Sequence, residues 1–448
     1  MHYIDIYDYL LLVLYVFFFS FLLLLKSKKY EQDKLKKFFI NGFFLHVAGS
    51  ILYCMVIQYY YGYGDSFGFY QGSNFLRKVI STTENPLGPF FLSGNDFEKV
   101  FGKISDNELS LPTGIGINSN LVIMKISAAL SYLSFNSYLI ISLFFGLFTF
   151  AGLWNLFLMF NEIMGKKNQR ILAIVLLYTP SICFWGSGLI KDSICLGLLG
   201  FICSFVYTLF IRKKFSIIKS LLLILFLYLL LVIKTYLAIA LLLSLALTAV
   251  VNLIIKRKNN VLKLVSISLI IFTTLTIVII SSSSSFNSIL EETKSNIETF
   301  KGAYANPDGD EERSMAEFST AFVDVNLPNL ILRAPLAFFT TLFRPFLWES
   351  RKPIVFFSAL ESFLTLLATV YLLIKCKVSR FFYFIFTDPY LFLCFTFTIL
   401  LGVIIGFTTF NFGTLVRYRL PILPFYFFML LSIHTKNKEL QVLKNRFQ

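Results

Sequence analysis

Long apolar runs alternate with short basic loops along most of this sequence. Runs such as residues 221–233 and 261–280 hold few charged side chains, and a helix needs about 20 apolar residues to cross a bilayer. The alternation predicts an all-α, polytopic integral membrane protein with about eleven transmembrane helices. The predicted spans are residues 6–25, 38–57, 137–160, 171–187, 193–211, 217–233, 236–254, 261–280, 354–374, 389–408 and 421–433.

Two longer polar segments interrupt the spans, at residues 58–135 and 281–353. The first is rich in Gly, Asn and Ser and closes with residues 121–133, where apolar side chains recur at helical spacing. The second closes with the amphipathic stretch 327–347. Amphipathic helices of this kind lie in the membrane interface, so each of these two outer loops is expected to carry an interfacial helix.

The positive charge follows the same alternation. Lysines and arginines gather in short loops between the spans, at residues 26–37, 166–170, 212–219, 256–263, 375–380 and 436–446. Short loops rich in these residues stay cytoplasmic, which with an odd span count predicts an outer N-terminus and a cytoplasmic C-terminus. The first apolar run is too long for a cleavable signal and follows acidic residues. Short loops and no eukaryotic retention signal favour a bacterial inner (plasma) membrane.

Composition excludes the soluble classes. The 448 residues are 57% hydrophobic and 15% charged, whereas a soluble domain carries about 25% charged residues. The net charge of +15 is therefore a topology signal, and no nucleic-acid partner is predicted. The six cysteines lack CxxC spacing and the three histidines are far apart, so neither a metal nor a cofactor is expected.

Ionisable residues at span ends are candidates for function, because such groups are costly in lipid unless they face a cavity. Five predicted outer turns carry a carboxylate, a cation or both. They hold Asp65; Lys191 and Asp192; Lys234 and Tyr236; Arg344 and Glu349; and Arg417 and Arg419. Snorkelling, interfacial anchoring or a local ion pair accounts for any one turn. Five turns at similar depth instead favour one site at the outer membrane surface.

The chemistry that suits this set is sugar transfer from a lipid-linked phosphate. Lys and Arg bind phosphate, and here they would stabilise it as it departs. A carboxylate acts as general base on an acceptor hydroxyl, and Asp65 is the candidate. The substrate-binding candidates are Lys191, Asp192, Lys234, Tyr236, Arg344, Arg417 and Arg419. Aromatic residues between positions 59 and 70 would suit stacking on sugars.

Three motifs resemble the GT-C superfamily of polytopic glycosyltransferases. Asp65 in Gly64-Asp-Ser-Phe-Gly-Phe-Tyr70 matches the Asp that follows a span in the first long outer loop. Residues 178–192 resemble a proline-containing span that leads to a charged outer turn, and residues 417–424 resemble the start of a final span. The resemblance implies an inverting enzyme that moves a sugar from a polyprenyl-phosphate-linked donor to a lipid, glycan or protein acceptor on the non-cytoplasmic face.

The chain divides on this interpretation into three parts. Residues 1–37 form an extra span and a cytoplasmic loop, residues 38–434 the GT-C-like domain, and residues 435–448 a cytoplasmic tail. The chain departs from the family in that extra span, in the lack of a large soluble C-terminal domain, and in the lack of an Asp-x-Asp pair in the first loop. The last departure argues against a metal-dependent mechanism.

Two alternatives stay open. O-antigen or polysaccharide polymerases and ligases also use outer arginines on lipid-pyrophosphate donors, and Arg333 and Arg344 in the second outer loop would serve that chemistry. A transporter or flippase of an anionic lipid is the other. Transporters often show internal repeats and ionisable groups near the midplane, but this sequence has no visible repeat and only His46 near a midplane.

Overall fold

All the elements of the structure that can be described are helices. The structure, a computed structural model, describes residues 3–31, 34–101, 112, 114–256, 327–350, 353–409 and 411–446. Within these ranges no strand occurs, and seven helices are long and apolar enough to cross a membrane, or eight if one bent pair is a single span. The all-α prediction is thus confirmed for the described residues, and the helices are those of a multi-pass membrane protein.

The chain forms two compact units, Met1–Ala238 and Ile239–Gln448, with the boundary inside α12 (Thr235–Lys256). The main helices of the first unit are α1 (Ile6–Ser27), α2 (Lys36–Met55), α3 (Asp65–Thr82), α4 (Gly88–Phe91), α5 (Gly94–Phe101), α6 (Asn118–Leu133), α7 (Tyr138–Ile163), α8 (Gln169–Leu177), α9 (Pro180–Trp185), α10 (Lys191–Val206) and α11 (Ile217–Ile233). π-helical turns extend α2 over Val56–Tyr61 and α10 over Tyr207–Ile211.

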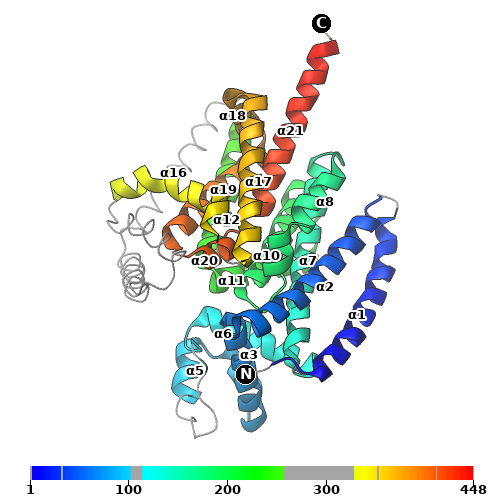
Figure 1. Cartoon of the computed structure of the whole chain (residues 1–448), viewed down its shortest axis with the longest axis vertical. Coiled ribbons are helices and arrows are strands. Elements are labelled where there is room, and N and C mark those ends of the chain that lie inside the picture. The colour runs from blue at the N-terminus through cyan, green and yellow to red at the C-terminus, as the bar shows by residue number, and fades with distance from the viewer. Residues whose placement is uncertain are drawn as a thin grey trace. The chain divides into compact units, whose positions relative to one another are not determined.

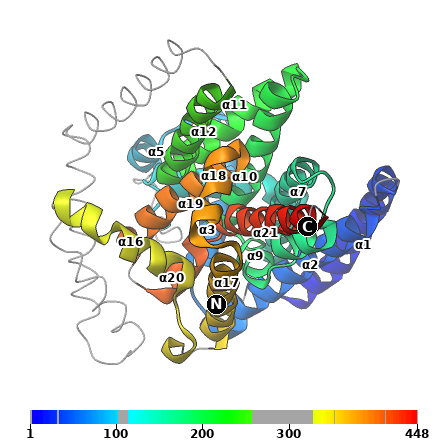
Figure 2. The same cartoon turned by 90° about the horizontal axis from the view of Figure 1, so that it is seen from above.

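Helix α7 is the centre of the first unit. It packs against α10, α2 and α1, and α1 runs beside α2 in both views (Figures 1 and 2). Gly152 of α7 faces Gly197 and Gly200 of α10, and a Cβ at any of these positions would collide with the facing helix. Small residues let membrane helices approach closely, because packing rather than water exclusion drives their association.

The predicted span 171–187 is interrupted. Helix α8 ends at Leu177 and α9 begins at Pro180, because proline lacks the N–H that a continuous helix needs. In lipid the carbonyls released by such a break need other donors. The Thr179 hydroxyl donates to the Val175 carbonyl at 2.9 Å, and the Cys183 thiol donates to the Leu177 carbonyl at 3.2 Å. Two short helices therefore replace the single predicted helix.

The second unit holds α16 (Leu327–Phe343), α17 (Pro353–Cys376), α18 (Val378–Thr387), α19 (Pro389–Thr408), α20 (Phe412–Tyr418) and α21 (Leu423–Arg446). Helix α19 packs against α16 and α21, and α17 packs against α16. Helices α20 and α21 form the bent pair, with an angle of 63° between them. All six cysteines of the chain are buried, two of them in this unit.

Other predicted elements differ from the structure in extent. Helix α11 has the predicted bounds, but its 17 residues leave it among the shorter apolar helices. Helices α3 and α5 lie in the first predicted outer loop, and α18 begins within the predicted basic loop 375–380. None of these three helices was predicted. Helix α21 continues through most of the predicted tail. The predicted span 261–280 lies outside the described residues.

Candidate functional site

The start of α10 is held rigidly by its neighbours. Ser193 donates through its hydroxyl to the Gly188 carbonyl at 2.7 Å, which closes the turn between α9 and α10. The Thr149 hydroxyl of α7 donates to the Ser193 carbonyl at 2.7 Å. Because residues 185–190 are buried, these bonds fix the first turn of α10, where Lys191 and Asp192 lie.

Asp192 and Lys234 form a buried ion pair. Their side chains are 1% and 6% exposed, and the Lys234 ammonium donates to the Asp192 carboxylate. Asp192 lies in the first turn of α10 and Lys234 directly after the end of α11. The dipole of α10 favours an anion in its first turn, where Asp192 lies. The Lys234 ammonium also lies 5.8 Å from the centre of the Tyr236 ring, within cation–π range.

Lys191 lies beside this pair and points to a different partner. Its ammonium donates to the Ser119 hydroxyl of α6 at 2.8 Å. The carboxylates of Asp65 and Asp192 and the Lys234 ammonium all act electrostatically on Lys191. The structure therefore brings five predicted residues into one neighbourhood. We call Asp65, Ser119, Lys191, Asp192, Lys234 and Tyr236 the α10 cluster.

Asp65 is exposed at the first position of α3. Gly64 precedes it with φ of 146°, a conformation that only glycine adopts readily. This glycine lets the chain turn sharply between the π-helical end of α2 and α3. The turn places a solvent-facing carboxylate after the π-helical end of α2, within electrostatic range of Lys191 from a distant segment.

Ser119 is the member of the cluster that sequence reasoning missed. The predicted interfacial helix, residues 121–133, is three residues shorter than α6 at its start and excludes Ser119. Its position at the beginning of an amphipathic helix was the available signal. No local pattern, however, relates position 119 to position 191.

In the second unit, Arg344 and Glu349 form a forked ion pair. The two side chains are 12% and 13% exposed and make two hydrogen bonds, of which the one from Arg344 Nε to Glu349 Oε2 measures 3.1 Å. Glu349 also accepts from the Phe346 amide at 2.8 Å. The guanidinium carbon lies 5.4 Å from the centre of the Phe412 ring. The pair thus closes the turn between α16 and α17.

Arg419 is buried, with 1% of its surface exposed. Its Nη1 donates to the Arg344 carbonyl at 2.8 Å and to the Ser362 hydroxyl at 2.6 Å, and its Nη2 donates to the Ser358 carbonyl at 3.2 Å. The guanidinium therefore ties the 344 turn to α17. This geometry favours a structural role for Arg419 over the predicted substrate-binding role.

Arg417 is half-buried in the last turn of α20. Together, Arg344, Glu349, Arg417 and Arg419 are called the arginine cluster below. Ser358 and Ser362 of α17 belong to its surroundings, and sequence reasoning did not identify them. Five of the eight predicted site residues thus lie in the α10 cluster, and Arg344 and Arg419 are joined in the second unit. The remaining one, Arg417, lies two residues before Arg419 in the chain.

His46, the ionisable residue nearest a predicted midplane, is fully buried in α2. Its Nδ1 lies 3.0 Å from the Ser187 hydroxyl, and its ring centre lies 5.6 Å from that of Phe150. The imidazole is thus packed between α2, α7 and the turn after α9. Among the residues that the structure describes, no group of three or more His, Cys, Asp or Glu side chains is arranged to hold a metal ion.

No family model matches this chain, and neither a curated protein nor a solved structure is significantly similar to it. The functional interpretation consequently depends on the chemistry of the two clusters.

Proposed function

We propose that this protein is an inverting glycosyltransferase. It moves a sugar from a polyprenyl-phosphate-linked donor to a lipid, glycan or protein acceptor on the non-cytoplasmic face of a bacterial plasma membrane. The observation that carries the proposal is the α10 cluster, in which the exposed Asp65 carboxylate lies in the electrostatic neighbourhood of Lys191. A carboxylate and a cation beside apolar helices suit a donor that is both membrane-anchored and anionic.

Lys191 is the phosphate-binding residue on this proposal. An ammonium group has three N–H donors, and one of them bonds to the neutral Ser119 hydroxyl. The remaining donors can bind a phosphate oxygen while Ser119 keeps the side chain in place. As the bond from the sugar to the phosphate breaks, negative charge accumulates on the leaving polyprenyl phosphate, and Lys191 stabilises that charge.

Asp65 is the general base. The acceptor hydroxyl oxygen attacks the anomeric carbon, its proton passes to the Asp65 carboxylate, and the bond from the sugar to the phosphate oxygen breaks on the opposite face. The anomeric configuration is therefore inverted. Asp192 and Lys234 are positioning residues, because their buried pair fixes the start of α10 from which Lys191 extends.

The test is sugar transfer by Asp65→Asn in proteoliposomes that contain a polyprenyl-phosphate sugar and an acceptor. Removal of a general base lowers the rate by about 10²- to 10⁴-fold. Glu84→Gln is the matched control, because Glu84 is also exposed and lies shortly after α3. A folded Asp65→Asn protein with wild-type transfer rates would exclude Asp65 as the base.

The polymerase or ligase alternative assigns the donor phosphate to Arg344 and Arg417. The fork between Arg344 and Glu349 already occupies much of the Arg344 guanidinium, which favours the α10 cluster for this task. Loss of transfer in an Arg344 variant that stays folded would reverse this preference.

A further inference from the structure

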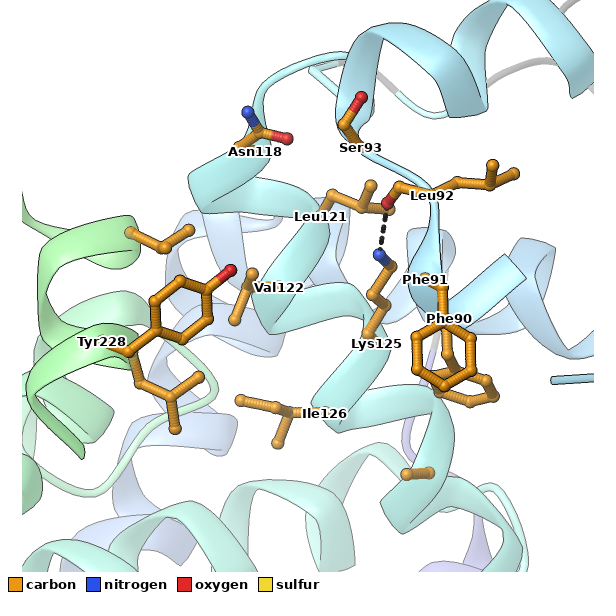
Figure 3. Close-up of a pocket in the computed structure, with 13 residues that line it drawn as sticks. Phe90, Phe91, Leu92, Ser93, Asn118, Leu121, Val122, Lys125, Ile126 and Tyr228 are labelled. Carbon is orange, nitrogen blue, oxygen red and sulfur yellow. Dashed lines mark hydrogen bonds between the residues drawn. The ribbon is translucent and has the colours of Figure 1, made fainter. Parts of the chain in front are cut away.

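A cavity of about 630 Å³ lies in the first unit, and Lys191 is not among its lining residues. Its walls come from α4 and the two residues after it, from α6 and from the end of α11 (Figure 3). Ligand sites in proteins measure about 300–1,000 Å³ and are mostly apolar with a few polar groups. The cavity has this size, and most of its lining residues are apolar. No carboxylate is among them.

One stripe of α6 forms the floor of the cavity. The stripe consists of Asn118, Leu121, Val122, Lys125, Ile126 and Ala129. Positions three and four residues apart share one face of a helix, so Lys125 lies in the middle of an apolar stripe. Ser119, the partner of Lys191, is not among the residues that line the cavity.

Lys125 is the cation of the cavity. Its side chain is half-buried, and its ammonium donates to the Leu92 carbonyl at 2.6 Å, as the dashed line in Figure 3 marks. Leu92 offers a neutral acceptor, and two N–H donors of the ammonium are left for a ligand. Burial lowers the pKa of Lys125, because a charged group loses solvation there. An anionic ligand beside the ammonium would favour its charged form and so raise this pKa again.

The cavity is lined on another side by a helix with an apolar outer surface. The exposed large side chains of α11 are Ile217, Ile218, Leu221, Ile224, Leu225, Tyr228 and Leu231. Apolar side chains exposed on a helix of a multi-pass protein face hydrocarbon. Tyr228 belongs both to this surface and to the cavity wall, so a membrane molecule can reach the cavity along α11.

We propose that this cavity binds an anionic amphiphile, with its phosphate headgroup on Lys125 and its hydrocarbon chain between α6 and α11. The apolar stripe and Phe90 and Phe91 contact the chain, while Lys125 selects for negative charge. The site is independent of sugar transfer, because it uses none of the residues assigned to that reaction.

Binding of fluorescent hexadecyl phosphate to the purified full chain, in nanodiscs of phosphatidylcholine, tests the proposal. Lys125→Gln should weaken binding by about tenfold or more, since hydrogen bonds to charged groups are strong. Lys125→Arg, which keeps the charge, should retain most of the affinity. Lys78→Gln should bind as wild type does, because Lys78 is exposed on α3. Ala129→Trp should weaken binding by filling the cavity.

Competition experiments separate the contribution of the phosphate headgroup to binding from that of the hydrocarbon chain. Unlabelled hexadecyl phosphate should displace the probe, whereas inorganic phosphate and hexadecanol should each need a much higher concentration. Equal displacement by inorganic phosphate would show a free-anion site and overturn the proposal. Wild-type affinity in both Lys125→Gln and Ala129→Trp would overturn it as well.

Discussion

Lys191 and Arg419 are both cations near helix ends in the sequence, but the structure gives them different hydrogen-bond partners. Each is a cation near the end of an apolar helix, and both were candidates for phosphate binding. Lys191 donates to the Ser119 hydroxyl, near an exposed carboxylate. Arg419 instead donates to three backbone carbonyls and a serine hydroxyl within its own unit. Both Nη groups of Arg419 thus hold the fold together, whereas the Lys191 ammonium keeps N–H donors that can bind a ligand.

The largest expected effect concerns the buried pair of the α10 cluster. Asp192→Asn leaves the Lys234 charge buried without its counter-ion, which costs about 3–5 kcal/mol of unfolding free energy. The double variant Asp192→Asn/Lys234→Met should recover most of this loss, because it removes the uncompensated charge. Chemical unfolding of the purified protein in detergent measures both. Equal destabilisation in the single and double variants would show that the uncompensated Lys234 charge is not the cause of the loss.

The next effect concerns catalysis and distinguishes the two clusters. Lys191→Met should lower kcat for sugar transfer by about 10²- to 10³-fold, as expected for loss of one group that stabilises transition-state charge. Its unfolding free energy should change far less than that of Asp192→Asn. Lys78→Met is the control for loss of an exposed lysine. A wild-type kcat in Lys191→Met would assign phosphate binding to another residue.

The smallest effect is expected at the fork of the arginine cluster. Arg344→Gln removes hydrogen bonds between charged groups, which contribute about 1.5–3 kcal/mol each when buried, and the slight exposure of this pair favours the lower end. Sugar transfer per folded molecule should stay within about threefold of wild type. If transfer instead falls by the factor expected for Lys191→Met while unfolding is unchanged, the polymerase or ligase mechanism is the better explanation.

Uniformly apolar runs with sharp ends were predictable from the sequence. Helices α11 and α19 have the predicted bounds, and Asp388 explains the second case, since its carboxylate caps α19 by accepting from the Tyr390 amide at 2.8 Å. Helix α3 was missed because glycine, serine and asparagine interrupt its apolar positions. The break at Pro180 was visible as a residue, but apolar flanks favoured one continuous span.

The candidate site was predictable as a set of residues and not as an arrangement. Charged residues at span ends carry a local signal, so Asp65, Lys191, Asp192 and Lys234 could be selected from the sequence. The choice of partner depends on contacts between distant segments, such as Lys191 with Ser119 and Asp192 with Lys234. Burial of Arg419 likewise depends on α17, about sixty residues earlier in the chain.

The burial of all six cysteines has a consequence for mapping membrane sidedness. A thiol must be exposed to water and ionise before an alkylating reagent can modify it. The native thiols should therefore not react with a membrane-impermeant maleimide. One cysteine introduced at an exposed position therefore reports its own compartment in intact cells, with the native chain as background. Placed beside Asp65, such a label would reveal from which side of the membrane the acceptor must arrive.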